Sequence, residues 1–218
     1  MKNFKEKSLF LGIIFGLLAL PILSWSSYED MLSEAKTRLN CSKDISIVEH
    51  TDNDDYARAY CNKISINRNL LDAAPLGFRR MILFHEVVHM NHNDYLVHDL
   101  LKKCILFGGS GLVYALSKNI NEPLLRAAAS LALATTSAVI ATDKYSKFME
   151  MRADTKAANA LGCEICLHEF NDHLERARIA ENVNEIVRTD KGYLSGSQIA
   201  EIAKTFKDQK CQQHNQQS

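Results

Sequence analysis

Two histidines four residues apart enclose a glutamate in the stretch His85-Glu86-Val87-Val88-His89. On a helix, side chains with this spacing project from one face about a turn apart, so both imidazoles can reach one metal ion. Zinc accepts neutral imidazole nitrogen at about 2.0–2.1 Å. Glu86 lies beside that face, where a carboxylate can hold and deprotonate a zinc-bound water, whose pKa the metal brings to about 7. The pattern therefore predicts a zinc site with Glu86 as general base.

A catalytic zinc ion needs a third protein ligand and keeps a fourth position open. The metzincin pattern would need glycine at position 92 and histidine at position 95. That class is excluded, because the sequence has His92 and Tyr95 there. His92 falls near the expected end of the helix, rotated away from the histidine pair, and His98 lies in the next segment. Both histidines stay open as alternative third ligands.

Glu150 is the favoured third ligand. Glu150 and Asp154 are four residues apart, so they share one face of an expected helix. Glu150 can ligate zinc while Asp154 accepts a hydrogen bond from the outer nitrogen of a ligand histidine, which fixes the tautomer of that imidazole. The alternative is a surface acidic pair among nearby basic residues. A small apolar run follows Asp154, however, at residues 157–161, and this run indicates that the helix packs closely against another element.

The elements that must position these residues are mostly helical. The helix carrying the histidine pair is expected over residues 76–92, with Pro75 at its first turn. Residues 45–48 and 64–66 are β-branched or alternating and indicate two strands of a small antiparallel sheet packed on that helix. Further helices are expected over residues 28–39, 143–161 (ended by Gly162), 169–187 and 197–207. The expected fold class is α+β and mostly helical.

Two uncharged spans, at residues 104–117 and 127–142, lie between the two candidate metal-binding segments. Both are shorter than the roughly 20 residues of a membrane-spanning helix. The second is rich in alanine, serine and threonine, which suits close helix packing. The spans predict an inserted apolar helical hairpin over residues 104–142. The hairpin is either buried in the protein or enters a membrane, and burial is the favoured interpretation.

The N-terminal residues 1–26 resemble a targeting segment rather than part of the fold. Three lysines come first, then an apolar run from Leu9 to Leu20, then Pro21 and a group of small residues. This order is typical of a secretory signal peptide, and an uncleaved N-terminal anchor is the alternative. Either way the remainder is expected outside the cytoplasm, periplasmic or secreted and possibly membrane-associated. Residues 27–205 are expected to form one domain, followed by a polar tail at 206–218.

Six cysteines lie in the part expected to be exported, and an even number in an oxidising compartment suggests disulfide bonds. Cys41 and Cys61 flank the expected strand pair and are the first choice for a disulfide. Cys163 and Cys166 form a CxxC motif. This motif can be a redox pair, half of a metal site or two structural cysteines, and a structural disulfide is favoured over a redox function or unpaired thiols. The other cysteines are Cys104 and Cys211.

The composition limits the classes of protein. The chain has 218 residues, which is enough for one domain with a proper core. Hydrophobic residues make up 46% and charged residues 24%, which excludes wholesale disorder. The 26 basic residues balance the 26 acidic ones, so the charge gives no reason to expect a nucleic acid as partner.

The order HExxH, apolar insertion and ExxxD on an alanine-rich helix ending in glycine resembles the gluzincin peptidases of the HtpX and CAAX prenyl protease family. The resemblance covers about residues 45–165. It implies a zincin-like domain with one Zn²⁺ per chain. It also implies that His85, His89 and Glu150 bind the zinc, that Glu86 is the general base, and that Asp154 supports a ligand histidine.

By this resemblance, the protein is a zinc-dependent metalloendopeptidase acting on exported or membrane-associated proteins or peptides. No His-Pro and no arginine stand at residues 190–199, where the family often has them. Tyr193, His168 and His173 are therefore the candidates for the group that stabilises the transition state. The strand around residues 62–67 is expected as an edge that pairs with an extended substrate. The alternative function is a non-catalytic, zinc-stabilised assembly or chaperone-like module.

Overall fold

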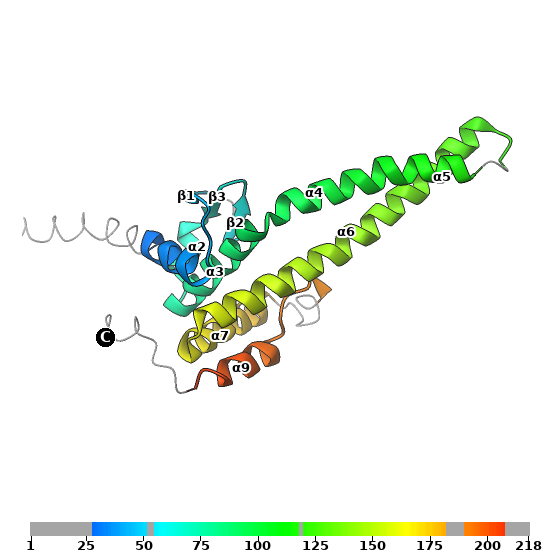
Figure 1. The fold of residues 1–218 in the computed structure, drawn as a ribbon. Coiled ribbons are helices and arrows are strands. Elements are labelled where there is room, and N and C mark those ends of the chain that lie inside the picture. The colour runs from blue at the N-terminus through cyan, green and yellow to red at the C-terminus, as the bar shows by residue number, and fades with distance from the viewer. Residues whose placement is uncertain (1–27, 52–54, 118–119, 182–189, 208–218) are drawn as a thin grey trace, which may run out of the picture.

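The structure is a computed structural model that describes residues 28–51, 55–117, 120–181 and 190–207. Its body combines helices with one small sheet, and a long helical hairpin projects from that body (Figure 1). The expected signal segment and most of the polar tail lie outside the described residues. The α+β, mostly helical fold class is confirmed.

The sheet has three strands, β1 (Ser46–Glu49), β2 (Ala57–Tyr60) and β3 (Lys63–Ile66), in the order β1-β3-β2. β3 pairs antiparallel with β2 but parallel with β1, so the sheet is mixed and not purely antiparallel as expected. Ile64 and Ile66 alternate with polar residues along β3 and are completely buried, which anchors the centre of the sheet in the core. β3 is therefore the central strand, and the expectation that residues 62–67 form an edge is wrong.

The histidine-carrying helix α3 (Leu76–His92) has the bounds that the sequence predicted. It begins directly after Pro75 and ends where Asn93 takes a left-handed conformation. Helix α7 (Glu164–Glu181) packs along it. At the start of α3, the Gly77 amide donates a hydrogen bond of 2.7 Å to Glu169. A Cβ atom at position 77 would come within 2.5 Å of the Cys166 backbone, so only glycine allows this approach.

Helix α6 (Pro123–Leu161) also packs against α3 and runs unbroken for 39 residues. The sequence predicted its two halves as separate segments, but no helix-breaking residue stands between them. Ala153, Ala157 and Ala158 of its second half are fully buried, so the axis of α6 comes close to α3. Gly162, in a left-handed conformation, ends the helix as predicted.

The remaining helices complete the body around α3. They are a helix over residues 28–38, α2 (Arg68–Asp72) and α9 (Gly196–Lys204). Helix α7 begins at Glu164, five residues before the predicted start, because the turn after Gly162 leads directly into it. All these helices contribute to one hydrophobic core, which includes Tyr28, Met31, Leu32, Ala35, Leu71, Phe78, Phe84, Leu161, Leu167, Phe170, Leu194, Ile199 and Ala203.

The hairpin consists of one arm made of α4 (Asp94–Cys104), the π-helical turn η1 (Ile105–Gly109) and α5 (Ser110–Leu116), and a second arm made of the first half of α6. The arms lie side by side and extend away from the body (Figure 1). Large apolar side chains on both arms are exposed, among them Leu112, Leu131 and Val139. The favoured prediction of a hairpin buried in the protein is therefore wrong for the described residues. By length and composition, α6 is the one described helix that is able to cross a membrane.

The expected disulfide between Cys41 and Cys61 is not formed, because both residues are free thiols. Cys166 is buried and forms no disulfide, so the CxxC motif does not close on itself, although Cys163 is disulfide-bonded. Instead the Cys166 sulfur accepts a hydrogen bond of 3.3 Å from buried Arg80, and the Cys166 amide donates to the Cys163 sulfur at 3.3 Å. The favoured structural disulfide therefore does not include Cys166, whose contacts are hydrogen bonds.

Candidate metal centre

Three side chains from two helices converge at one point. The Nε2 atoms of His85 and His89, both on α3, lie 2.9 Å apart. The Oε2 atom of Glu150, from α6, lies 3.1 Å from the first nitrogen and 3.5 Å from the second. Ligand atoms about 2.05 Å from a tetrahedral zinc ion are separated by about 3.3 Å, so the three atoms have the spacing of three corners of a zinc tetrahedron. The donor set of two imidazoles and one carboxylate fits zinc.

Each histidine has a carboxylate partner on the side away from this point. His85 Nδ1 lies 2.8 Å from Asp154 Oδ1, and His89 Nδ1 lies 2.8 Å from Asp94 Oδ2. Both carboxylates are buried. A carboxylate that accepts from Nδ1–H leaves the lone pair of Nε2 free for a metal, which fixes the tautomer the site needs.

Asp154 lies against a histidine of the cluster, where the resemblance placed it, and it also contacts a second element. Its other oxygen, Oδ2, accepts a hydrogen bond of 2.9 Å from the Leu194 amide. Asp154 therefore fixes the residue next to Tyr193. On the other side of Tyr193, Gly192 has a φ of +92° and lies against the backbone of Lys147, where a Cβ atom would come within 2.3 Å. The segment before α9 is thus fixed from both sides.

Tyr193 is placed over the histidine pair by these contacts. Its ring centroid lies 5.9 Å from that of His85, and it lines the same cavity. Burial raises the pKa of the Tyr193 phenol, and the nearby carboxylates and a hydrogen bond to Glu150 raise it further. The phenol therefore keeps its proton and is available as a hydrogen-bond donor.

Glu86 is buried at the edge of this group. Burial raises the pKa of its carboxyl above the ordinary value, while the two histidines and the backbone of Ala59 on β2 act against this rise. A carboxylate with a raised pKa is a stronger base than one at the surface. The contact with Ala59 also brings the outer strand β2 next to Glu86.

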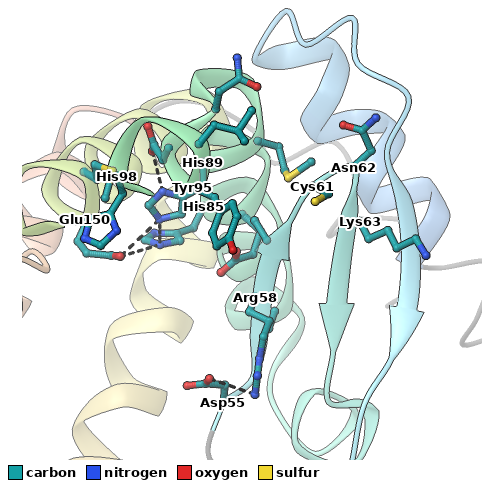
Figure 2. A pocket seen from close by; sticks show the side chains of 18 of the residues that line it. Asp55, Arg58, Cys61, Asn62, Lys63, His85, His89, Tyr95, His98 and Glu150 are labelled. Atoms are coloured by element: carbon teal, nitrogen blue, oxygen red, sulfur yellow. Dashed lines mark hydrogen bonds and ion pairs between the residues drawn. The ribbon is translucent and has the colours of Figure 1, made fainter. Parts of the chain in front are cut away.

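The group opens into a cavity of about 750 Å³ between β2, the end of α3 and the root of the hairpin (Figure 2). Asp55, Arg58 and Lys63 line it from the side of the sheet, and Tyr95, His98 and Met149 line it from the side of the hairpin. A cavity of this size holds a stretch of several residues of peptide.

The other candidate residues lie elsewhere. His92 Nε2 contacts the ammonium of Lys156 at 2.8 Å, and His98 lines the cavity outside the three-residue cluster. His168 is on the body 3.7 Å from Glu164. His173 lies 3.3 Å from the Tyr56 hydroxyl and packs against Phe78. Of the three candidates for the transition-state group, the cavity brings only Tyr193 to the cluster.

Sequence reasoning missed Asp94, the carboxylate partner of His89. Asp94 is the first residue of α4, where an acidic residue is equally explained by the positive end of the helix dipole. Its spacing of five from His89 could have suggested a role, but only the left-handed turn at Asn93 brings it back onto the imidazole.

Comparison with known proteins identifies the family to which this chain belongs. The family model of peptidase family M48 matches residues 27–169, which include α3 and the Glu150 segment of α6. The chain belongs to peptidase family M48. It is therefore a metallopeptidase of the gluzincin kind. His85, His89 and Glu150 form a cluster that can bind a metal ion. No curated protein and no solved structure matches the chain significantly.

The electrostatics of the cluster predict that zinc binding releases protons. Burial lowers the pKa of His85, but its hydrogen bonds to Asp154 and Glu150 outweigh burial and raise the pKa to about 10. His85 is therefore protonated at neutral pH, and zinc must displace that proton. Hydrogen bonds to Asp94 and Glu150 also raise the pKa of His89 against the effect of burial. Zinc affinity should therefore rise at least about tenfold for each pH unit between pH 6.5 and 8.5, as measured by competition with a chelator of known proton affinity.

The matched control for this titration is His98→Ala, which removes a cavity histidine outside the cluster and should leave the slope unchanged. A zinc affinity that stays constant across this pH range, after correction for the chelator, would contradict the protonated state of His85.

Proposed function

We propose that this M48 peptidase is a zinc-dependent metalloendopeptidase that hydrolyses peptide bonds in exported or membrane-associated proteins. The observation that carries the proposal is the convergence of His85, His89 and Glu150 beside a buried glutamate at the end of an open cavity. A zinc-stabilised module without activity would have no use for a buried base at this place, so Glu86 favours the enzyme over that alternative.

His85, His89 and Glu150 would hold one Zn²⁺ ion. When bound, the ion polarises the scissile carbonyl and makes water acidic enough to lose a proton near neutral pH. Glu86 takes that proton and passes it to the leaving amine. The Tyr193 phenol donates a hydrogen bond to the oxygen on which negative charge develops. Asp154 and Asp94 keep the two imidazoles in the orientation that these steps need.

An extended peptide would align along β2. β2 is the outer strand of the sheet on the side of the cavity, and Ala57, Arg58 and Ala59 line that cavity. Main-chain hydrogen bonds to an outer strand bind a peptide with little dependence on its sequence. Because Ala59 also contacts Glu86, a peptide on this strand passes the general base. β2 replaces the strand at residues 62–67 as the proposed substrate edge.

The catalytic assignment is tested with Glu86→Gln, which keeps the shape of the side chain and removes the base. We expect zinc to stay bound at one ion per chain and casein hydrolysis to fall at least about a hundredfold, in line with the loss of a general base. Asp55→Asn, a cavity carboxylate paired with Arg58 at 3.4 Å, is the matched control and should keep activity within about threefold. Equal cleavage by wild type and Glu86→Gln would make the assignment wrong.

The role of Tyr193 is tested with Tyr193→Phe, which removes only the hydroxyl. Loss of one donor to a developing oxyanion costs roughly 10²–10³ in kcat, and KM should change little. Tyr95→Phe is the control, because Tyr95 lines the same cavity but is half exposed and packs against Tyr60. A Tyr193→Phe enzyme with wild-type kcat would contradict this role.

We also propose that the hairpin inserts into a lipid bilayer. The buried residues on the first half of α6 are small, at Ser130, Ala134 and Ala138, and they face the other arm. The large apolar residues point outward instead. This arrangement suits lipid, where helices associate through small residues and bulky apolar side chains meet acyl chains. Residues 124–142 span about 28 Å as a helix, close to the thickness of a bilayer core. Arg126 reaches back to the Ile120 carbonyl at the tip.

The order of residues 1–26 supports export of the same chain. With the N-terminal lysines on the cytoplasmic side, the metallopeptidase body would lie outside the cytoplasm, in the periplasm or secreted and held at the membrane surface by the hairpin.

Membrane insertion is tested by liposome flotation of a chain starting at residue 27, which lacks the N-terminal apolar run. We expect the unmodified chain to float and the double variant Leu131→Arg/Val139→Arg to stay at the bottom, because two buried charges cost several kcal/mol in lipid. The control Ile165→Arg/Ile179→Arg changes two exposed apolar residues of the body and should float. Equal flotation of both double variants would contradict insertion of the hairpin.

A further inference from the structure

The two metal-ligand histidines are supported by different parts of the molecule. The Asp154 carboxylate that holds His85 is tied to the body through the Leu194 amide. The Asp94 carboxylate that holds His89 is instead tied to Arg152, whose Nη2 pairs with Asp94 Oδ1. Asp94 is the first residue of one hairpin arm and Arg152 belongs to the helix that forms the other. The partner of His89 is thus fixed where the two arms leave the body.

We propose that Arg152 is a positioning residue for the metal centre. It acts through Asp94, so that the affinity for zinc depends on the ion pair between the first residue of α4 and the half of α6 that packs in the body. The inference rests on the proposed zinc site and concerns a residue outside the three-residue cluster. In the described part of the chain, Arg152 pairs with Asp94, and its guanidinium lies 5.5 Å over the Phe148 ring.

The burial of Asp94 explains why the pair matters. The Asp94 side chain is only 4% exposed, and a buried carboxylate needs a partner for each oxygen. Oδ2 accepts from His89 and Oδ1 accepts from Arg152, so both oxygens are satisfied and the carboxylate cannot rotate without losing one bond. Without the guanidinium, Oδ1 loses its charged donor among the residues that the structure describes, and the carboxylate gains freedom to turn away from the imidazole. His89 then loses the contact that fixes its tautomer and ring orientation.

The ion pair between Asp94 and Arg152 links α4 to α6 directly beside the turn between α3 and α4. Asn93 alone separates α3 from α4 and has a φ of +55°. Lys43 fixes this turn, because its ammonium donates to the Met90 carbonyl and lies 2.6 Å from Asn93 Oδ1. A change in the angle of α4 therefore moves Asp94 relative to Arg152 on α6. The orientation of His89 therefore depends on how α4, the base of the first arm, sits against α6, whereas that of His85 depends on contacts within the body.

The test measures zinc affinity by chelator competition in the full chain. We expect Arg152→Ala to bind zinc about 10- to 100-fold more weakly than wild type, the loss usual for an outer-shell partner. Lys147→Ala is the matched control, because Lys147 lies on the same helix in an exposed pair with Asp143 at 3.0 Å, and its affinity should stay within about threefold. Asp94→Asn, which keeps the size of the side chain, should also lose at least about tenfold.

A double-mutant cycle shows whether Arg152 acts through Asp94. If it does, Asp94→Ala/Arg152→Ala binds zinc no more weakly than Asp94→Ala alone, because the second change removes a residue whose partner is already absent. The visible spectrum of the cobalt-substituted protein should change in Arg152→Ala and stay as in wild type in Lys147→Ala, since the spectrum reports ligand geometry and not general stability.

Several results would overturn the proposal. They are a wild-type affinity in Arg152→Ala or Asp94→Asn, fully additive losses in the double variant, and an unchanged cobalt spectrum in Arg152→Ala. These outcomes are separate from failure of the zinc site itself. If the wild-type protein binds no zinc, the proposed function is wrong, whereas tight binding by wild type and Arg152→Ala alike refutes only the role of Arg152.

Discussion

The close contact between α3 and the second half of α6 is the constraint on which the site depends. The histidine pair and Glu150 are more than sixty residues apart in the chain, and only this contact brings them together. Ala153, Ala157 and Ala158 make it possible, because a larger buried side chain at any of them would push the helices apart. A separation of even about 1 Å would take the Glu150 oxygen out of the range that a single zinc ion bridges.

The same contact buries several charges, and the fold tolerates them because each has a partner. The pKa of Glu150 is held well below its usual range by hydrogen bonds from the two histidines, against the effect of burial. The pKa of Asp94 is likewise lowered by His89 and Arg152 despite burial. Buried charges are costly unless paired, so the acids and histidines stabilise one another. Glu150 is ionised and faces the protonated histidines. A bound metal ion would replace their proton as the positive partner of this carboxylate.

Local signals in the sequence predicted helix α3 and the members of the candidate metal cluster. Pro75 and the spacing of His85 and His89 defined α3, and the four-residue spacing of Glu150 and Asp154 identified their shared face. Those signals act within one or two helical turns. The strand β2 was missed because Ala57-Arg58-Ala59-Tyr60 has weak β propensity and becomes a strand by pairing with β3. Asp94 was missed for a related reason, since its contact with His89 depends on the backbone angle of Asn93.

The hairpin shows most clearly where local patterns stop being informative. Its apolar residues predicted helices, but the same pattern fits burial in protein and burial in lipid, and only the contacts of each face distinguish them. In the structure, small residues face inward and large ones outward. Because α6 is one continuous helix, its apolar half and Glu150 are rigidly connected. From Thr142 to Glu150 the helix rises about 12 Å. In a bilayer-inserted hairpin, the metal centre would therefore lie just above the lipid surface, within reach of peptide segments that emerge from the membrane.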